Sequence, residues 1–167
     1  MHSIKQHITE SQQLTDRGSL LWKEANNLRW RVRAIRGATT VTENSREAIA
    51  EAVSELIDAI EIHNRLDTDE IVSVTFSVTS DLDAIFPAAV ARRCQGWGDV
   101  PLLDVQHMKV EPSLQKCIRI LIHLNTPLPK DRLRHIYLRD AALLRPDLAI
   151  SNTRTYAHTA ESHQCIS

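Results

Sequence analysis

Residues 114–124 read Leu-Gln-Lys-Cys-Ile-Arg-Ile-Leu-Ile-His-Leu and describe a strand with one charged residue inside it. Alternation predicts a buried face made of Ile118, Ile120, Ile122 and Leu124. The opposite face carries Arg119 among Cys117, Leu121 and His123. A fixed positive charge in a half-buried strand is unfavourable unless an anion meets it. Arg119 therefore predicts a carboxylate of the protein or an anionic ligand at this place.

Periodic patterns on both sides of this strand predict further strands and helices. In chain order they are a strand at 29–36 that stops before Gly37, a helix from Asn44 or Ser45 to about 64, a strand at 71–78, a short helix at 86–93 and a short strand at 100–105. In the strand at 71–78, one face is expected to carry Val72, Val74, Phe76 and Val78, and the other Ser73, Thr75 and Ser77.

Composition favours one globular domain and excludes several classes of partner. The chain has 167 residues, of which 43% are hydrophobic, and a formal net charge of −1. This balance gives no basic surface for nucleic acid or an anionic membrane, and no apolar run reaches the roughly 20 residues of a membrane span. Cys94, Cys117 and Cys165 are odd in number and form no CxxC pair. We expect a reduced, cytoplasmic protein without a metal site.

Three segments are expected along the chain. Residues 1–29 are polar and predict a flexible extension or a start codon placed too early, 30–150 carry the domain, and 151–167 predict a flexible tail. His158 and His163 in that tail are expected to face solvent.

Arginines occur at the ends of predicted helices and strands or within strands, without acid–base partners. They are Arg36, Arg92, Arg119 and Arg145, with Tyr137 as a nearby hydroxyl donor. No nucleophile–base pair and no glycine-rich phosphate loop accompanies them. Such a site suits a small polyanion whose reaction needs charge stabilisation and confinement rather than proton transfer, although simple anion binding would use the same residues.

Six motifs together resemble the monofunctional chorismate mutases of the trimeric bacterial class. They cover about residues 31–148 in the order of that family and are Arg33–Thr40, Phe86–Ala88, Val100–Leu102, Lys116–Arg119, Arg134–Leu138 and Leu144–Leu148. The resemblance implies an α/β (α+β) fold, with a mixed sheet flanked by helices in a pseudo-α/β-barrel homotrimer. It also implies active sites between subunits and rearrangement of chorismate to prephenate in phenylalanine and tyrosine synthesis, without a cofactor.

The same resemblance implies roles for individual residues. Arg119 would donate to the breaking ether bond, and Arg36 and Tyr137 would hold a carboxylate of the substrate. The residues expected to line the pocket or its mouth are Phe86, Ala88, Ala89, Arg92, Leu103, Leu144 and Arg145.

Three positions depart from the family's usual pattern. His107 stands where the family has a glutamate that orients the catalytic arginine, Asp104 where a cysteine is common, and Ala89 where a lysine is frequent. A protonated His107 would repel Arg119, so its pKa is expected to be lowered. We hypothesise that Asp104 replaces the missing carboxylate. The alternatives are a non-catalytic anion-binding or regulatory trimer of the same fold and, less favoured, a Rid-like imine deaminase.

Overall fold

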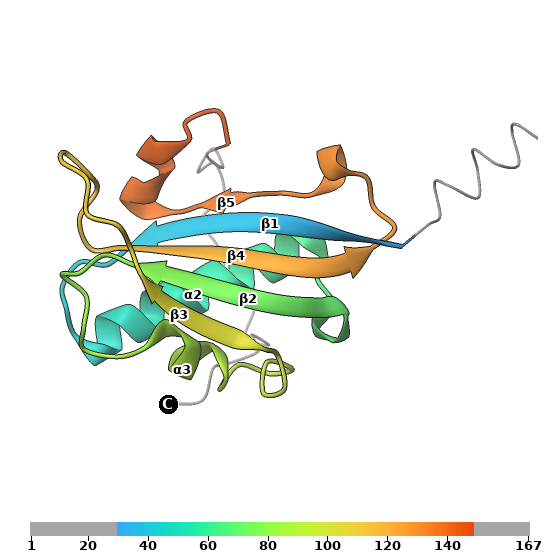
Figure 1. Ribbon diagram of the computed structural model, residues 1–167, viewed down its shortest axis with the longest axis horizontal. Coiled ribbons are helices and arrows are strands. Elements are labelled where there is room, and N and C mark those ends of the chain that lie inside the picture. Colours follow the sequence, from blue (N-terminus) through green and yellow to red (C-terminus); the bar gives the residue numbers. More distant parts are fainter. Residues whose placement is uncertain (1–29, 149–167) are drawn as a thin grey trace, which may run out of the picture.

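A computed structural model describes residues 30–148 of the chain, which form one mixed sheet with helices packed on one side (Figure 1). The five strands lie in the order β3-β2-β4-β1-β5. Their bounds are β1 (Arg31–Thr40), β2 (Ile71–Val78), β3 (Leu102–Gln106), β4 (Cys117–Thr126) and β5 (Ile136–Tyr137). The helices are α2 (Arg46–Asn64) and α3 (Pro87–Ala91), with the 3-10 helices η1 (Thr68–Glu70), η2 (Lys130–Arg132) and η3 (Arg139–Leu144).

The strand that contains Arg119 is the centre of this sheet. β4 pairs antiparallel with β1 on one side and with β2 on the other, whereas β3 and β5 add in parallel at the two edges. The side chains predicted to be buried, Ile118, Ile120, Ile122 and Leu124, are 0–5% exposed. The expected mixed sheet and the two faces of β4 are therefore confirmed.

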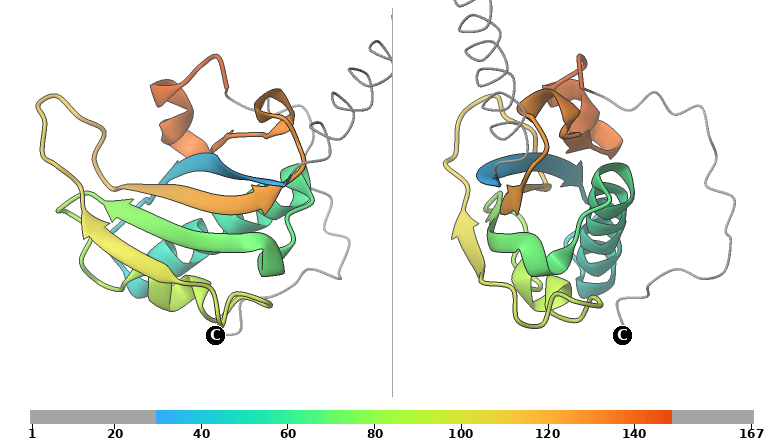
Figure 2. Two further views of the ribbon diagram at one scale, coloured as in Figure 1. Left: turned by 45° about the vertical axis from the view of Figure 1, so that its right-hand side comes forward. Right: turned by 90° about the vertical axis from the view of Figure 1, so that its right-hand side faces the viewer.

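The core fills the space between the sheet and α2, which lies along one face (Figure 2). Ser45 caps the helix by accepting a hydrogen bond from the Ala48 backbone N–H at 3.2 Å, as expected for a serine at this position. The buried face of α2 consists of Ile49, Ala52, Val53, Leu56, Ile57, Ala59 and Ile60. Because α2 covers only this face, the other face of the sheet stays open for a binding site.

Two strands differ from the sequence prediction. β1 does not stop before Gly37 but runs to Thr40, because its pairing with β4 continues through Gly37. Gly37 lies where a Cβ would come within 2.8 Å of the Ile120 side chain, so the glycine permits close packing instead of ending the strand. In β2, a register shift between Ile71 and Ser73 breaks the alternation, so Ile71 is buried and Val72 is 43% exposed. The hydrophobic face predicted for β2 is therefore wrong at Val72.

Cys117 is a free, buried thiol in β4. Among residues 30–148 no helix has the length and apolar character needed to cross a bilayer.

Candidate active site

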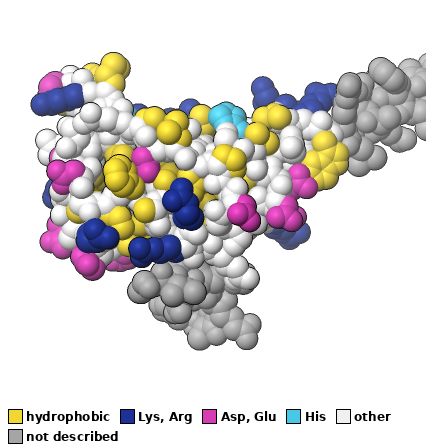
Figure 3. Space-filling view, turned by 60° about the horizontal axis from the view of Figure 1, so that its bottom comes forward, with side chains coloured by type: hydrophobic (Ala, Val, Ile, Leu, Met, Phe, Trp, Pro, Cys, Tyr) yellow, Lys and Arg dark blue, Asp and Glu magenta, His cyan; other side chains and the backbone are white. Residues whose placement is uncertain are grey.

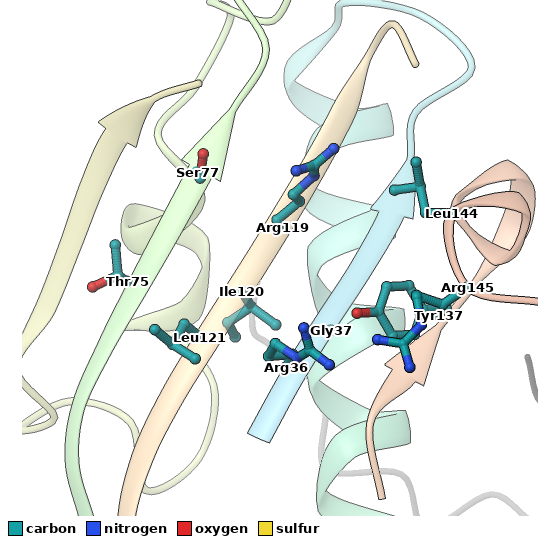
Figure 4. Close-up of a pocket in the computed structure, with 10 residues that line it drawn as sticks. All are labelled: Arg36, Gly37, Thr75, Ser77, Arg119, Ile120, Leu121, Tyr137, Leu144 and Arg145. Carbon is teal, nitrogen blue, oxygen red and sulfur yellow. The ribbon is translucent and has the colours of Figure 1, made fainter. Parts of the chain in front are cut away.

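A cavity of about 480 Å³ lies on the open face of the sheet, where β2, β4, β1 and β5 contribute side chains (Figure 4). Its lining residues are Arg36, Gly37, Thr75, Ser77, Arg119, Ile120, Leu121, Tyr137, Leu144 and Arg145. The cavity thus brings together five of the residues proposed from sequence: Arg36, Arg119, Tyr137, Leu144 and Arg145.

Arg119 has room at the centre of the cavity because its neighbours are small. It pairs with Ala38 across β1 and with Ser77 across β2. Its side chain is half-buried, and its Nε atom is buried without a hydrogen-bond partner. None of the salt bridges found within residues 30–148 involves Arg119. A buried cation without a carboxylate partner is the arrangement that an anionic ligand would complete.

Arg36, Tyr137 and Arg145 form a second group of donors in the cavity, away from Arg119 (Figure 4). The Arg36 backbone N–H donates to His135 Nδ1 at 3.1 Å, which holds β1 against the segment leading into β5. Burial, and then Arg36 and Arg145, lower the pKa of His135, so its ring is held neutral beside these cations. The group offers the Arg36 guanidinium fork and the Tyr137 phenol to an anion, with the positive charge of Arg145 beside them.

Arg145 is oriented by a bidentate pair with Asp147. The Nε and Nη2 atoms of Arg145 donate to the two carboxylate oxygens of Asp147 at 2.8 and 2.7 Å. The hydrogen bond from Arg145 lowers the pKa of Asp147. This pair fixes the direction of the guanidinium at the end of η3.

His107 follows β3 and contacts the cavity through Ser77. Its Nδ1 atom lies 3.1 Å from Ser77 Oγ, and its backbone N–H donates to the Val78 carbonyl at 2.7 Å. Burial lowers the pKa of His107, and Arg119 lowers it further. The lowered pKa of His107 expected from the sequence is therefore confirmed, and the positive charge of Arg119 disfavours protonation of the imidazole.

Asp104 points away from Arg119 within the same chain. It pairs with Phe76 of β2, whose side chain is buried on the helix side of the sheet, whereas Arg119 pairs with Ser77 on the open side. The Asp104 carboxylate instead accepts a hydrogen bond from the Ala88 backbone N–H at 3.1 Å, in the first turn of α3. Burial raises the pKa of Asp104. The hypothesis that Asp104 replaces the missing carboxylate therefore finds no support in the contacts within one chain.

The remaining predicted residues lie along β3 and α3, outside the cavity. They are Phe86, Ala88, Ala89, Arg92 and Leu103, which we call the edge group. Phe86 is 71% exposed and Leu103 is 58% exposed. The face that carries α3 and β3 shows hydrophobic side chains gathered among charged ones (Figure 3). A single chain therefore does not bring the edge group to Arg119.

Thr75, Ser77 and Leu121 line the cavity but were not proposed from sequence as site residues. A usable signal existed, because alternation places Thr75 and Ser77 on the polar face of β2, and Leu121 shares a face with Arg119. Within the described part of the chain, no group of three potential metal-ligating side chains is found.

Comparison with known proteins gives one family. The family model described as chorismate mutase type I matches residues 32–148. The chain belongs to this family. It is 39% identical over 120 residues to "Chorismate mutase AroH" of Bacillus subtilis, which covers 72% of the chain and 94% of that protein. It is 47% identical over 118 residues to the protein of the same name from Thermus thermophilus, covering 70% of the chain and 96% of that protein.

A solved structure shares the fold of this chorismate mutase family member. The chorismate mutase from Clostridium thermocellum superposes with a TM-score of 0.64 at 41% sequence identity. The match covers 66% of the chain and 98% of the solved structure. The resemblance drawn from the six sequence motifs is therefore confirmed by sequence and by fold.

Proposed function

We propose that the protein is a chorismate mutase that converts chorismate to prephenate, without a cofactor, for phenylalanine and tyrosine synthesis. The observation that carries the proposal is Arg119, a half-buried guanidinium in the cavity with no carboxylate partner among residues 30–148. A dicarboxylate with an ether bridge supplies the negative charge that this cavity lacks. Membership of the chorismate mutase family indicates the reaction, and the residues that line the cavity are the groups that we expect to perform it.

The rearrangement is pericyclic, so the protein has no proton to move and no covalent intermediate to form. Its contribution is to hold the substrate in a compact shape and to stabilise charge that develops as the C–O bond breaks. Arg119 donates to the ether oxygen, where negative charge grows in the transition state. Arg36, Tyr137 and Arg145 bind the carboxylates, with Leu144 and Leu121 as apolar walls.

The edge group completes the cavity from a neighbouring subunit of a homotrimer. In the part of the chain that the structure describes, β3 is an edge strand whose outer side has no partner strand, and Phe86 and Leu103 expose large apolar side chains beside it. Exposed edges and apolar patches of this kind are normally covered by another chain. Covering this face with a second copy would place Arg92 and Phe86 near another subunit's cavity.

Loss of chorismate absorbance on addition of the purified protein, with prephenate identified as the product, tests the activity. Arg119→Ala is the informative variant, and Arg46→Ala is its matched control, because Arg46 is an exposed arginine in the first turn of α2 on the other side of the sheet. Turnover that is lost in the first variant and kept in the second supports the proposal. Binding of a bicyclic transition-state mimic without turnover would instead support the non-catalytic alternative.

A complementation experiment tests the composite site. Arg119→Ala removes the cavity's donor and Arg92→Ala removes an edge-group cation, so each homotrimer lacks one half of every site. Co-expression of the two variants produces mixed trimers in which some sites contain both intact halves. Recovered activity in the mixture supports sharing between subunits, whereas activity no higher than in the separate variants contradicts it. Light scattering gives the number of subunits.

The family match does not favour the alternatives. A Rid-like imine deaminase finds no support, because the family model and the named relatives are all chorismate mutases. A cytoplasmic location and the domain limits at 30 and 150 stay predictions from the sequence.

A further inference from the structure

Among residues 30–148 no salt bridge gives Arg119 a carboxylate partner, and Ser77 and His107 form a hydrogen-bonded pair that can replace one. Ser77 stands directly opposite Arg119 in the ladder between β2 and β4 and lines the cavity. Its hydroxyl lies 3.1 Å from His107 Nδ1. Asp104, the carboxylate expected to serve Arg119, faces α3 instead.

A neutral imidazole can accept a hydrogen bond only through its unprotonated nitrogen, and the bond made by one ring nitrogen decides the state of the other. If Nδ1 carries the proton and donates it to Ser77 Oγ, Nε2 keeps its lone pair. That lone pair is then the electron-rich atom of the ring, and it is attracted to a guanidinium. In the opposite tautomer Nε2–H would be a donor, and Arg119, whose charge acts on this ring, offers only donors as well.

We propose that Ser77 is a positioning residue that holds His107 in the Nδ1–H tautomer, so that the Nε2 lone pair orients Arg119. The Ser77–His107 pair thereby takes over the task that the family gives to a glutamate. Burial and Arg119 lower the pKa of His107, which is consistent with a neutral ring in this place. The inference rests on the proposed mutase function for its effect on rate, but its geometry can be tested without any substrate.

The chain supplies a matched control on the same strand. Ser73 lies on the same face of β2, four residues before Ser77, and its Oγ is 3.3 Å from His123 Nδ1. This second pair has the same chemistry but no contact with the cavity that contains Arg119. Ser73→Ala removes a serine–histidine pair and leaves the one at His107 intact.

Two-dimensional 15N NMR of histidine-labelled protein distinguishes the tautomers, and His107→Gln assigns the signal. We expect Nδ1–H at His107 in the wild type, and a shift toward Nε2–H in Ser77→Ala with kcat/KM lowered about tenfold, the effect of one ordinary hydrogen bond. Ser77→Thr retains the hydroxyl and should restore both, and Ser73→Ala should change neither.

An Nε2–H signal in the wild type, or a Ser77→Ala variant with unchanged tautomer and rate, overturns the inference. Failure of the proposed function has a different signature, because a protein that does not turn over chorismate can still show the predicted tautomer and its response to Ser77→Ala. A loss of rate in Ser77→Ala that Ser77→Thr does not repair also contradicts it, because steric disturbance would then explain the loss.

Discussion

Arg36 and Arg119 are diagonal neighbours on the open face of β1 and β4. Arg36 pairs directly with Leu121, and Arg119 lies two residues along the same strand face. Diagonal neighbours in an antiparallel ladder are about 7–8 Å apart, so the two side chains can reach one small ligand between them. Both guanidiniums line one cavity, so a small ligand with two negative groups can meet both of them.

Arg119→Met should therefore separate activity from stability. The substitution removes the donor to the breaking bond and should lower kcat/KM at least a hundredfold to a thousandfold, since one well-aimed donor is worth about 3–4 kcal/mol. It also removes a like charge and a buried Nε atom without a partner, so the free energy of unfolding should stay unchanged or rise by up to about 1 kcal/mol. Urea unfolding and steady-state kinetics measure the two effects.

Arg119→Lys provides the companion measurement. Lysine retains the positive charge but loses the planar fork, so strong impairment is expected here too. Near-normal turnover in Arg119→Lys would show that charge alone, rather than directed hydrogen bonding, supports the reaction.

Acid should weaken both activity and stability through His107 and His135. The pKa of each is lowered in the folded protein, mainly by burial and then by neighbouring arginines. Below the unfolded value of 6.5, the unfolded chain binds protons that the folded chain resists, so the free energy of unfolding should fall as the pH drops through this window.

The value of kcat/KM should also fall as the pH drops, because protonated His107 adds a positive charge that acts on Arg119. Rates at pH 5 to 8, with denaturation curves at each pH, measure the two responses. His107→Gln keeps a neutral side chain and should flatten the acid limb. An unchanged acid limb in that variant would assign the loss to another group.

The side chain of Arg139 should hold η3, and with it Arg145, in place. Its side chain reaches Glu55 at 2.8 Å, the Thr40 carbonyl at 3.2 Å and Glu51 at 3.3 Å, and so ties η3 to α2 and to the end of β1. η3 ends with Leu144, directly before Arg145. Arg139→Ala should raise KM several-fold and lower the free energy of unfolding by only about 1 kcal/mol, since both glutamates are exposed to solvent.

Arg139→Gly is the control for backbone strain at position 139. The backbone of Arg139 has φ = +50°, a conformation that glycine adopts readily. The glycine variant should therefore be less destabilised than the alanine variant, by up to about 1 kcal/mol, yet show the same rise in KM. A normal KM in both variants would mean that η3 holds its position without Arg139.

Asp104 should act on stability rather than on the reaction. It accepts a hydrogen bond from Ala88 in the first turn of α3, where the N-cap residue Phe86 offers no side-chain cap. Asp104→Ala should lower the free energy of unfolding by about 1 kcal/mol, the usual value of a helix cap. Asp104→Asn keeps an acceptor oxygen, so turnover within threefold of the wild type is expected. A large loss of rate in Asp104→Asn would return Asp104 to the site, from a neighbouring subunit.

The sequence was most informative where the chemistry of one residue and the periodicity of the apolar residues around it pointed to the same structure. The alternation around Arg119 predicted the buried face of β4, and the apolar spacing predicted α2 with a cap at Asn44 or Ser45, of which the structure has Ser45. Prediction failed where the deciding contact is distant in sequence. The bulge at Val72 depends on pairing with β4, and the direction of Asp104 depends on its register against Phe76.

The site residues show the same difference between local patterns, which the sequence reveals, and contacts between distant residues, which it does not. Arg36, Tyr137 and Arg145 were found by motif and lie in one cavity, but the link between Ser77 and His107 joins residues 30 positions apart. Alternation could place Ser77 on the polar face of β2, yet only the parallel pairing of β2 with β3 brings His107 beside it. The sequence alone therefore identifies the donors and His107, but not Ser77, to which His107 is bonded.

Gly37 should be the position in β1 least tolerant of a side chain. A Cβ there would lie 2.8 Å from Ile120 Cγ2, 3.1 Å from Ile60 Cδ1 and 3.2 Å from the Ile136 carbonyl oxygen. Two of these neighbours belong to the core and the third is backbone of β5, so the atoms cannot all move aside. Gly37→Ala should lower the free energy of unfolding by about 1–3 kcal/mol, as overpacking of a core does.

The same substitution should also reduce activity, because Gly37 lies between α2, β4 and β5 and directly follows Arg36. Pushing β5 away from β1 shifts Tyr137 relative to Arg36, and a displacement of this kind lowers the rate even when all groups are present. Gly98→Ala is the matched control, since no atom lies within 4 Å of a Cβ at that position. Its free energy of unfolding should stay within about 0.5 kcal/mol of the wild type. If Gly37→Ala unfolds at the same urea concentration as Gly98→Ala, the close packing of β1 between α2 and β4 does not limit the site.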